Sequence, residues 1–211
     1  EKPIIAKIAA NTVKSKTLIR VLEVLSEGEI KGLVDGAKSI YFNNTPLQNT
    51  DDSYNFNNVV WDQRFGLPSQ TYMEGFPSAQ AEYGVQTNVT NSSPAIYTVT
   101  GPVVDAARCT LIFPSGLTEQ DPTNGNLNGS AVSVAFDVKL EPSGVWQTVR
   151  TAEIKEKTTS AYEIAFRIER PVGTGAWSLR VRRITPDPAT SNIRNTFQLS
   201  RVVEIQDVKL E

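Results

Sequence analysis

The chain has 211 residues, and 21 lysines and arginines face 23 aspartates and glutamates, so the formal net charge is −2. This balance argues against a general nucleic-acid-binding protein, which needs a surplus of positive charge. Histidine is absent and Cys109 is the only cysteine. The composition therefore excludes Ser-His-Asp and Cys-His triads, imidazole metal ligands and an internal disulfide within this chain. Because the only methionine is Met73, we expect a piece of a longer protein.

The first half of the chain has an irregular pattern. Residues 1–16 are basic and lack a hydrophobic period, which predicts an extended arm. Residues 18–25 have leucines and valines at helical spacing but are rich in β-branched residues; the pattern leaves helix and strand open and slightly favours a strand. Asn43 and Asn44 predict the turn of a hairpin within residues 38–47. Residues 48–95 are crowded with polar residues and predict a loop-rich stretch with a function or a partner of its own.

The second half shows strand patterns. Within residues 129–140, Phe136 and its alternate neighbours form an apolar face, whereas Asp137 lies on the polar face. A Pro-Ser-Gly turn then predicts a hairpin with residues 145–150. The same alternation marks residues 107–113, 162–168, 177–182 and 197–205, with 96–100 as a weaker candidate. We therefore predict a mainly β protein, an antiparallel β-sandwich or barrel, with under a fifth of its residues helical.

Oxygen-rich loops are the first candidates for chemistry, because calcium prefers oxygen ligands. The candidate ligands are Asp51 and Asp52 in one loop, and Asp121, Asn124, Asn126 and Asn128 in another. The second loop lacks the bidentate glutamate that completes a calcium loop. Turn formation is the commoner use of these residues, so we predict no metal and no cofactor.

A basic cluster and the tryptophans are the other candidates. The cluster consists of Arg167, Arg170, Arg180, Arg182 and Arg183. It suits an acidic partner or phosphate, but ion pairs with Glu163 and Glu169 explain it more simply. Trp61, Trp146 and Trp177 leave a carbohydrate-binding β-sandwich module open as an alternative function, although we expect Trp177 in the core. Cys109 is expected to be a buried hydrophobe, and no catalytic pair is evident.

One stretch resembles a known family. Residues 25–47 read LSEGEIKGLVDGAKSIYFNNTPL and resemble the N-terminal pattern of the lambda-type phage tail-tip attachment proteins, the host specificity protein J family. The matching residues are Ser26, Glu27, Gly28, Ile30, Gly32, Val34, Asp35, Gly36, Lys38, Ser39, Thr45 and Pro46. Further matches at 157–162, 180–187 and 204–209 extend the resemblance over nearly the whole chain.

The resemblance implies a structural role without enzymatic activity, in the hub of a siphophage or prophage tail tip. The family's hub is trimeric and resembles baseplate hubs, so the implied partners are other copies and neighbouring tail proteins, with no nucleic acid and no direct membrane contact. The implied location is the virion tail tip, after synthesis in the bacterial cytoplasm. The implied division is an arm and hub segment at 1–92, a β-sandwich insertion at 93–186 and a return strand toward the hub at 187–211.

The glycine-rich segment 26–36 also has a physical interpretation. Gly28, Gly32 and Gly36 recur every four residues, which suits bends and close backbone approach in a subunit contact; turns within one subunit remain the alternative. The expected contact residues are Ser26, Glu27, Gly28, Ile30, Gly32, Asp35 and Gly36. We expect the arm 1–16 to take part in this contact and, in an isolated chain, to be mobile or to borrow contacts from a neighbouring molecule, because it has little apolar surface to bury.

Overall fold

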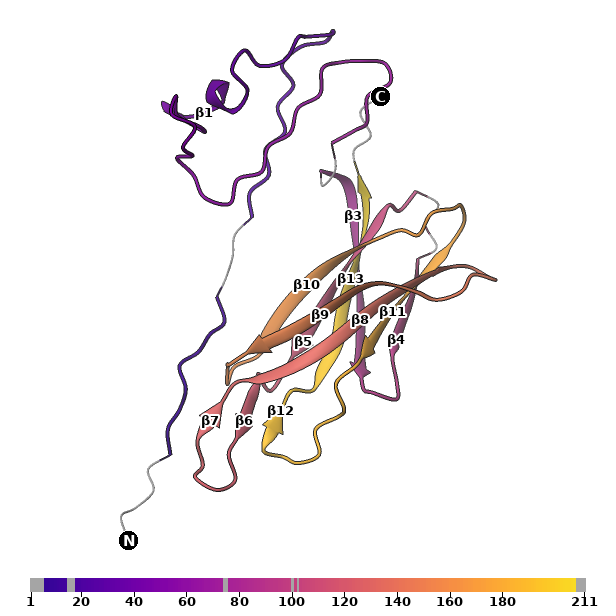
Figure 1. Cartoon of the computed structure of the whole chain (residues 1–211). Helices are drawn as coiled ribbons and strands as arrows, with labels where there is room; N and C mark the ends of the chain where they lie inside the picture. The colour runs from indigo at the N-terminus through magenta and orange to yellow at the C-terminus, as the bar shows by residue number, and fades with distance from the viewer. Residues whose placement is uncertain (1–5, 15–17, 74–75, 100, 102, 208–211) are drawn as a thin grey trace. The chain divides into compact units, whose positions relative to one another are not determined.

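Figure 1 shows the computed structural model of the chain, which describes residues 6–14, 18–73, 76–99, 101 and 103–207. The chain divides into two compact units. One unit combines Glu1–Thr17 with Pro77–Gln206, and we call it the sandwich unit. The other combines Leu18–Phe76 with Asp207–Glu211, and we call it the small unit.

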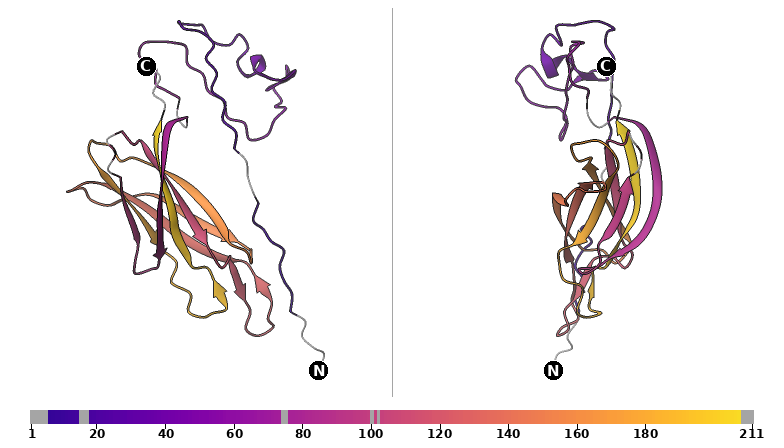
Figure 2. Two further views of the ribbon diagram at one scale, coloured as in Figure 1. Left: turned by 180° about the vertical axis from the view of Figure 1, so that it is seen from behind. Right: turned by 90° about the vertical axis from the view of Figure 1, so that its right-hand side faces the viewer.

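Two four-stranded sheets form the sandwich unit, and the right-hand view of Figure 2 shows them as facing layers. The first sheet has the order β10 (Tyr162–Glu169), β5 (Ala106–Phe113), β13 (Phe197–Asp207) and β3 (Pro77–Val89). The second has the order β4 (Ala95–Val99), β11 (Trp177–Arg183), β8 (Ser130–Leu140) and β9 (Gln147–Glu156). The pairs β10–β5, β5–β13, β4–β11, β11–β8 and β8–β9 are antiparallel. The predicted antiparallel β-sandwich is confirmed.

A third, smaller sheet lies at one end of the sandwich (Figure 1). Its order is β12 (Ile193–Arg194), β6 (Thr118–Gln120) and β7 (Leu127–Asn128). The loop between β6 and β7 contains the Asn-rich stretch that follows Asp121. β7 pairs with β6 along one edge, and its other edge forms hydrogen bonds with the N-terminal arm.

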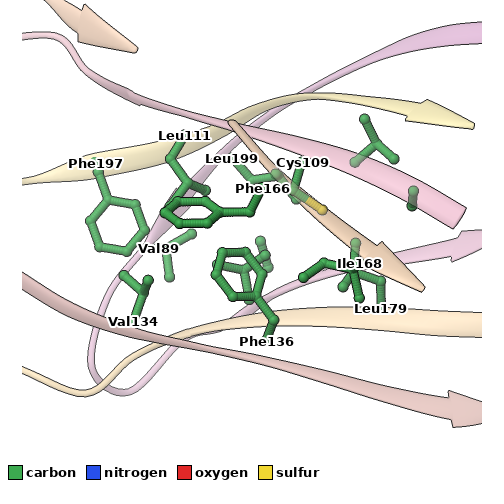
Figure 3. Packing of buried hydrophobic residues seen from close by; sticks show 14 of the residues in the cluster. Val89, Cys109, Leu111, Val134, Phe136, Phe166, Ile168, Leu179, Phe197 and Leu199 are labelled. Carbon is green, nitrogen blue, oxygen red and sulfur yellow. The ribbon is translucent and has the colours of Figure 1, made fainter. Parts of the chain in front are cut away.

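The core fills the space between the two large sheets. Figure 3 shows apolar side chains from both sheets pointing into the same interior. Phe136 from β8 meets Phe166 from β10 with ring centroids 4.9 Å apart. Phe136 and Trp177 are fully buried, as their alternation predicted. Cys109 is buried too, and burial raises the pKa of its thiol, so it is a core hydrophobe as expected.

The small unit has little regular structure. Its described elements are the 3₁₀ helix η1 (Gly36–Ser39) and the hairpin strands β1 (Tyr41–Phe42) and β2 (Thr45–Pro46). Asn43 has φ 53° in the turn between the strands, which confirms the predicted asparagine turn. Since η1 is the only helix among the described residues, the expectation of low helix content is also confirmed.

Two expectations about the first half were wrong. Residues 18–25 form no regular structure, because no neighbouring strand pairs with them and most of their side chains are exposed. Conversely, the 13-residue strand β3 lies inside the stretch 48–95 that was expected to be loop-rich. The sandwich thus takes β3 from before residue 93 and β13 from after residue 186, and it extends beyond the expected range 93–186 on both sides. Residues 208–211 of the expected return strand lie outside the described residues.

Candidate interaction surfaces

The glycine-rich segment 26–36 lies against a second stretch of the small unit. The backbone N–H of Ile30 donates to the carbonyl of Phe65 at 2.9 Å. The backbone N–H of Leu33 points to Oε1 of Gln63 at 3.5 Å, a long hydrogen bond. The segment is therefore held within its own chain by residues 63–65.

At two of the three glycine positions, the backbone has a positive φ that favours glycine over other residues. Gly32 has φ +96°, and a Cβ at that position would lie 2.6 Å from the ring of Phe65. Gly36 has φ +55° where η1 begins, and the ring of Trp61 lies 3.8 Å from its ideal Cβ. Gly28 has no heavy atom within 4 Å of an added Cβ, so crowding in this chain does not explain it. Turns and contacts within one subunit thus account for Gly32 and Gly36. They do not account for Gly28, whose Cβ position is surrounded by open space.

The polar residues of the segment act locally. The Ser26 hydroxyl accepts a hydrogen bond from the backbone N–H of Gly28 at 3.2 Å, as expected for a turn cap. Asp35 is also in a capping position, before η1, but its side chain makes no capping bond; its backbone N–H donates to Oγ of Ser39 at 3.1 Å. Glu27 is exposed. The structure therefore assigns no intrachain role to the Glu27 side chain.

Apolar exposure is the main feature of the small unit. Among residues 18–73, Ala37 and Leu47 are the buried apolar side chains. The exposed large ones are Leu18, Ile19, Val21, Val24, Leu25, Val34, Tyr41, Phe42, Tyr54, Val60 and Leu67. Val34, inside the glycine-rich segment, is 93% exposed, and Val60 is 95% exposed. Exposed apolar side chains gathered in one short region make it a candidate interaction surface.

The two oxygen-rich loops that were considered as candidate calcium sites use several of their oxygens in local contacts. Asp51 accepts hydrogen bonds from the hydroxyl and the backbone N–H of Ser53, which lower its pKa, and Asp52 forms an ion pair with Lys38 at 2.8 Å. In the second loop Asp121 accepts from Thr123 and Asn124. The described residues contain no group of three or more acidic residues and cysteines that could hold a metal ion.

The second loop instead contacts the N-terminal arm. Oδ1 of Asn126 accepts a hydrogen bond from the backbone N–H of Lys7 at 2.7 Å. Ile8 forms a parallel bridge with Leu127 in β7. Further along, the backbone N–H of Thr12 donates to the carbonyl of Lys157 at 3.1 Å. The described part of the arm, residues 6–14, is extended as predicted but bonded to its own sandwich, in contrast to the mobility that we expected.

The predicted basic cluster divides into separate contacts. Arg180 and Arg182 both bind Asp137, with nitrogen–oxygen distances of 2.8 and 2.6 Å. Asp137 was expected on the wet face of β8, yet it is fully buried, because these two long side chains and Thr148 cover it. Burial alone would raise the pKa of Asp137, but hydrogen bonds from Arg182, Thr148 and Arg180 outweigh it and lower the pKa to about 2.

The other arginines bind elsewhere. Arg183 is buried and donates to the carbonyl and the side-chain oxygen of Asn195, both at 2.8 Å. Arg167 pairs with Glu169 at 2.6 Å, and Arg170 donates to the carbonyl of Gly175 at 2.9 Å. The five arginines therefore form no single anion site, and local pairing explains them.

The tryptophans also have separate environments. Trp177 is fully buried, and Trp61 packs against Gly36 in the small unit. Trp146 lies on the sandwich, where the guanidinium of Arg180 and the ammonium of Lys139 lie 4.5 and 5.1 Å from its ring centroid. Cations thus contact the ring that a sugar would need, and no observation favours the carbohydrate-binding alternative.

Sequence reasoning missed the surface that holds the arm. Asn126 and Lys157 were noted only as part of a polar loop and of a family-like motif. Their role depends on residues 119 and 146 positions away along the chain, which no local pattern reveals. Among the described residues, no helix is long and apolar enough to cross a membrane.

Comparisons with known proteins agree on one family. Residues 79–208 match the family model "Tip attachment protein J, FNIII-A domain". Tip attachment protein J of Escherichia phage SECphi27 is 29% identical over 99% of this chain, and that of Escherichia phage SECphi4 is 31% identical over 95%. The chain spans 17% and 18% of the length of these two relatives.

This chain is also similar to a solved structure from Sulfurospirillum deleyianum, and the matched region covers 61% of this chain and 98% of the other. The identity is 11% and the TM-score is 0.32. Agreement this low supports no inference, so the assignment depends on the family model, whose match over residues 79–208 runs from within β3 to the end of β13. The chain belongs to the tip attachment protein J family and contains its FNIII-A domain.

Proposed function

We propose that this chain is a structural part of a phage tail tip, the scaffold portion of a longer tip attachment protein, and that it has no catalytic role. Family membership and the small share of the relatives that the chain spans support this proposal. Its location would be the tail of the virion, after synthesis in the bacterial cytoplasm. Residues 1–92 and 187–211 would supply the hub segments, apart from β3 and β13, which belong to the sandwich, and the sandwich would project as an insertion.

The single observation that supports a subunit contact is the exposed apolar surface of the small unit. Residues 18–25 alone expose five large apolar side chains, each by more than 60%. Burying such side chains is worth about 1.5–3 kcal/mol each, whereas leaving them in water gives nothing toward ordering this loop-rich unit. A partner surface would provide the missing burial.

We assign that partner to other copies of the chain, as a trimer in the intact tail, and to neighbouring tail proteins. The glycine-rich segment would contribute through Ser26, Glu27, Gly28, Ile30, Gly32, Asp35 and Gly36. Gly28 and Glu27 fit this role best, because neither is required by a contact within the chain. The adjacent Val34 supplies apolar area, since its side chain is 93% exposed.

Light scattering coupled to size-exclusion chromatography tests the proposal. We expect the wild-type chain, or a longer form that includes more of the protein, to form trimers with increasing concentration. Serine at Ile19, Val21 and Val24 should weaken assembly, because these side chains are 79%, 68% and 74% exposed. Serine at Val145 and Val172 on the sandwich, 79% and 100% exposed, is the matched control and should not. A wild-type protein that stays monomeric in both forms would contradict the proposal.

A further inference from the structure

The N-terminal arm docks on the sandwich unit by adding a strand. The backbone N–H of Leu127 donates to the carbonyl of Lys7 at 2.8 Å, and the backbone N–H of Ala9 donates to the carbonyl of Leu127 at 2.9 Å. Since β6 already pairs with the opposite edge of β7, the arm extends the small sheet by one strand. An edge strand with free N–H and C=O groups is a template for this kind of pairing.

Side chains anchor the arm beyond this pairing. The Lys157 side chain is part of a residue only 5% exposed, and its ammonium donates to Oδ1 of Asn11 at 2.9 Å. The backbone N–H of Lys157 donates to the Thr12 hydroxyl at 2.8 Å, and that hydroxyl donates to the Glu156 carboxylate. Charge-assisted bonds of this kind are stronger than neutral ones. We call Asn126, Leu127, Glu156 and Lys157 the docking edge.

In the described part of the arm, the side chains of residues 6–12 bury little surface against the sandwich. Residues 6–12 are exposed, and Ile8 is 72% exposed although its backbone pairs with Leu127. The docking therefore depends on hydrogen bonds along one edge. The same arm sequence from another molecule would form the same bonds, which is the condition for low-cost exchange of an element between protomers.

Chain connectivity favours this exchange. Between the arm and β3 lies the stretch 18–76, which belongs to the small unit. Intramolecular docking must close a loop of this length, which lowers the effective concentration of the arm at its own docking edge and lets the docking edge of a neighbour compete. A neighbour that is already held through the small unit supplies the alternative docking edge at high effective concentration.

We propose that the docking edge is an inter-subunit site that takes residues 6–14 of a second copy of the chain. This inference depends on the self-association proposed above and specifies one of its contacts. The arm of one copy would pair with β7 of the next, and Asn11 and Thr12 would bind Lys157 and Glu156 there. Each copy would then donate one arm and accept one.

Cross-linking between variants that each carry one introduced cysteine tests the exchange. Ile8→Cys and Leu127→Cys are made in separate proteins, unfolded together, refolded together at high concentration and treated with a short bis-thiol reagent. Cys109 contributes little background, because it is buried. A covalent species of two chains that contains one copy of each variant is the expected product. Ile8→Cys mixed with Val172→Cys, whose site is 100% exposed, is the control for random collision.

A second variant checks the anchors. Adding Asn11→Ala and Thr12→Ala to the Ile8→Cys chain should reduce the cross-linked yield several-fold while the melting of the sandwich stays unchanged. If chains assemble by light scattering but the mixed pair gives no more product than the control, the exchange is wrong and the proposed self-association stands. If the chains stay monomeric throughout, both are wrong.

Discussion

The sandwich unit and the small unit use their apolar residues in opposite ways. The sandwich buries Trp177, Phe136 and Phe113 completely between two sheets of four strands. Among residues 18–73 of the small unit, Ala37 and Leu47 are the buried apolar side chains, whereas Val34 and Val60 lie almost fully in solvent. The sandwich thus has a buried core of its own, whereas the small unit leaves many of its large apolar side chains in solvent.

Local structure follows the same division. In the sandwich, long antiparallel pairs such as β8–β9 satisfy the backbone, and the apolar faces meet across the core (Figure 3). In the small unit, turns are fixed by side-chain contacts such as the ion pair between Lys38 and Asp52. Exposed ion pairs of this kind add little stability, because water screens the two charges, so they position a surface without stabilising it strongly. Predictions that separate stability from assembly test this comparison.

The largest effect is expected from truncating the sandwich core. Phe136→Ala should lower the free energy of unfolding by about 3–5 kcal/mol, because it leaves a cavity beside Phe166. Denaturant melts of the sandwich measure this change. Val172→Ala, at a fully exposed position, is the control and should change stability by less than about 0.5 kcal/mol. A loss below about 1 kcal/mol for Phe136→Ala would contradict the assignment of this face to the core.

Acid should remove a smaller part of the same stability. The pKa of Asp137 is lowered from its ordinary value of 3.8 to about 2 in the folded chain. When folding lowers the pKa of a carboxyl, the ionised carboxylate stabilises the folded state. This stabilisation is complete at pH values above the pKa in the unfolded chain, and it is lost as the pH falls through the pKa in the folded chain. We expect about 2 kcal/mol to disappear between about pH 4 and pH 2.

Comparing the wild type with Asp137→Asn isolates that contribution. The variant should be less stable at neutral pH, and its stability should depend less on pH over the acid range. Urea melts at a series of pH values measure the difference. Parallel pH profiles for the two proteins would show that Arg180 and Arg182 stabilise Asp137 no more in the folded chain than water does in the unfolded one.

The sequence predicts strands best where both faces have a clear chemistry. Residues 130–140 and 177–183 alternate and lie in the centre of a sheet, so the prediction was confirmed. β3 is the last strand of its sheet, and most of its side chains are exposed, so its alternation of Tyr83, Val85 and Val89 with polar residues was lost among loop-forming neighbours. Edge strands give a weak signal because only one side of them is paired.

Interaction surfaces are less predictable, because they depend on distant residues. The alternation along β8 predicts a solvent-exposed side chain at Asp137. Its burial becomes favourable because two arginines of the neighbouring strand β11 form ion pairs with it. The docking edge joins residues from the arm, β7 and the end of β9, which the sequence keeps far apart. By contrast, the family pattern in residues 25–47 located a segment whose exposed valine and unconstrained glycine are consistent with a contact.

A substitution in the small unit should have a local effect. Gly66 has φ +81°, and an added Cβ would lie 2.9 Å from the carbonyl oxygen of Gly28. Gly66→Ala should therefore weaken the local structure by about 1–2 kcal/mol, the cost of the left-handed conformation for an L-residue. Hydrogen exchange at the Ile30 amide, which bonds to Phe65, should become faster while β8 keeps its protection.

Gly28→Ala is the matched control, because open space surrounds its Cβ position. In an isolated chain this variant should leave exchange at Ile30 unchanged. If Gly66→Ala also destabilised the sandwich globally, the two units would fold as one cooperative structure, and the contrast between them would be wrong.

The smallest change in stability is expected at the most exposed valines. Val34→Ser and Val60→Ser should alter the free energy of unfolding of a monomer by less than about 0.5 kcal/mol, because both side chains are already in water. If the small unit is a contact surface, the same pair should weaken trimer formation, since each lost contact removes apolar burial that exists only in the assembly. Sedimentation equilibrium of the double variant beside wild type measures this effect. If the wild type assembles and the double variant assembles equally well, Val34 and Val60 lie outside the contact. The contact surface of the small unit would then be assigned to residues 18–25.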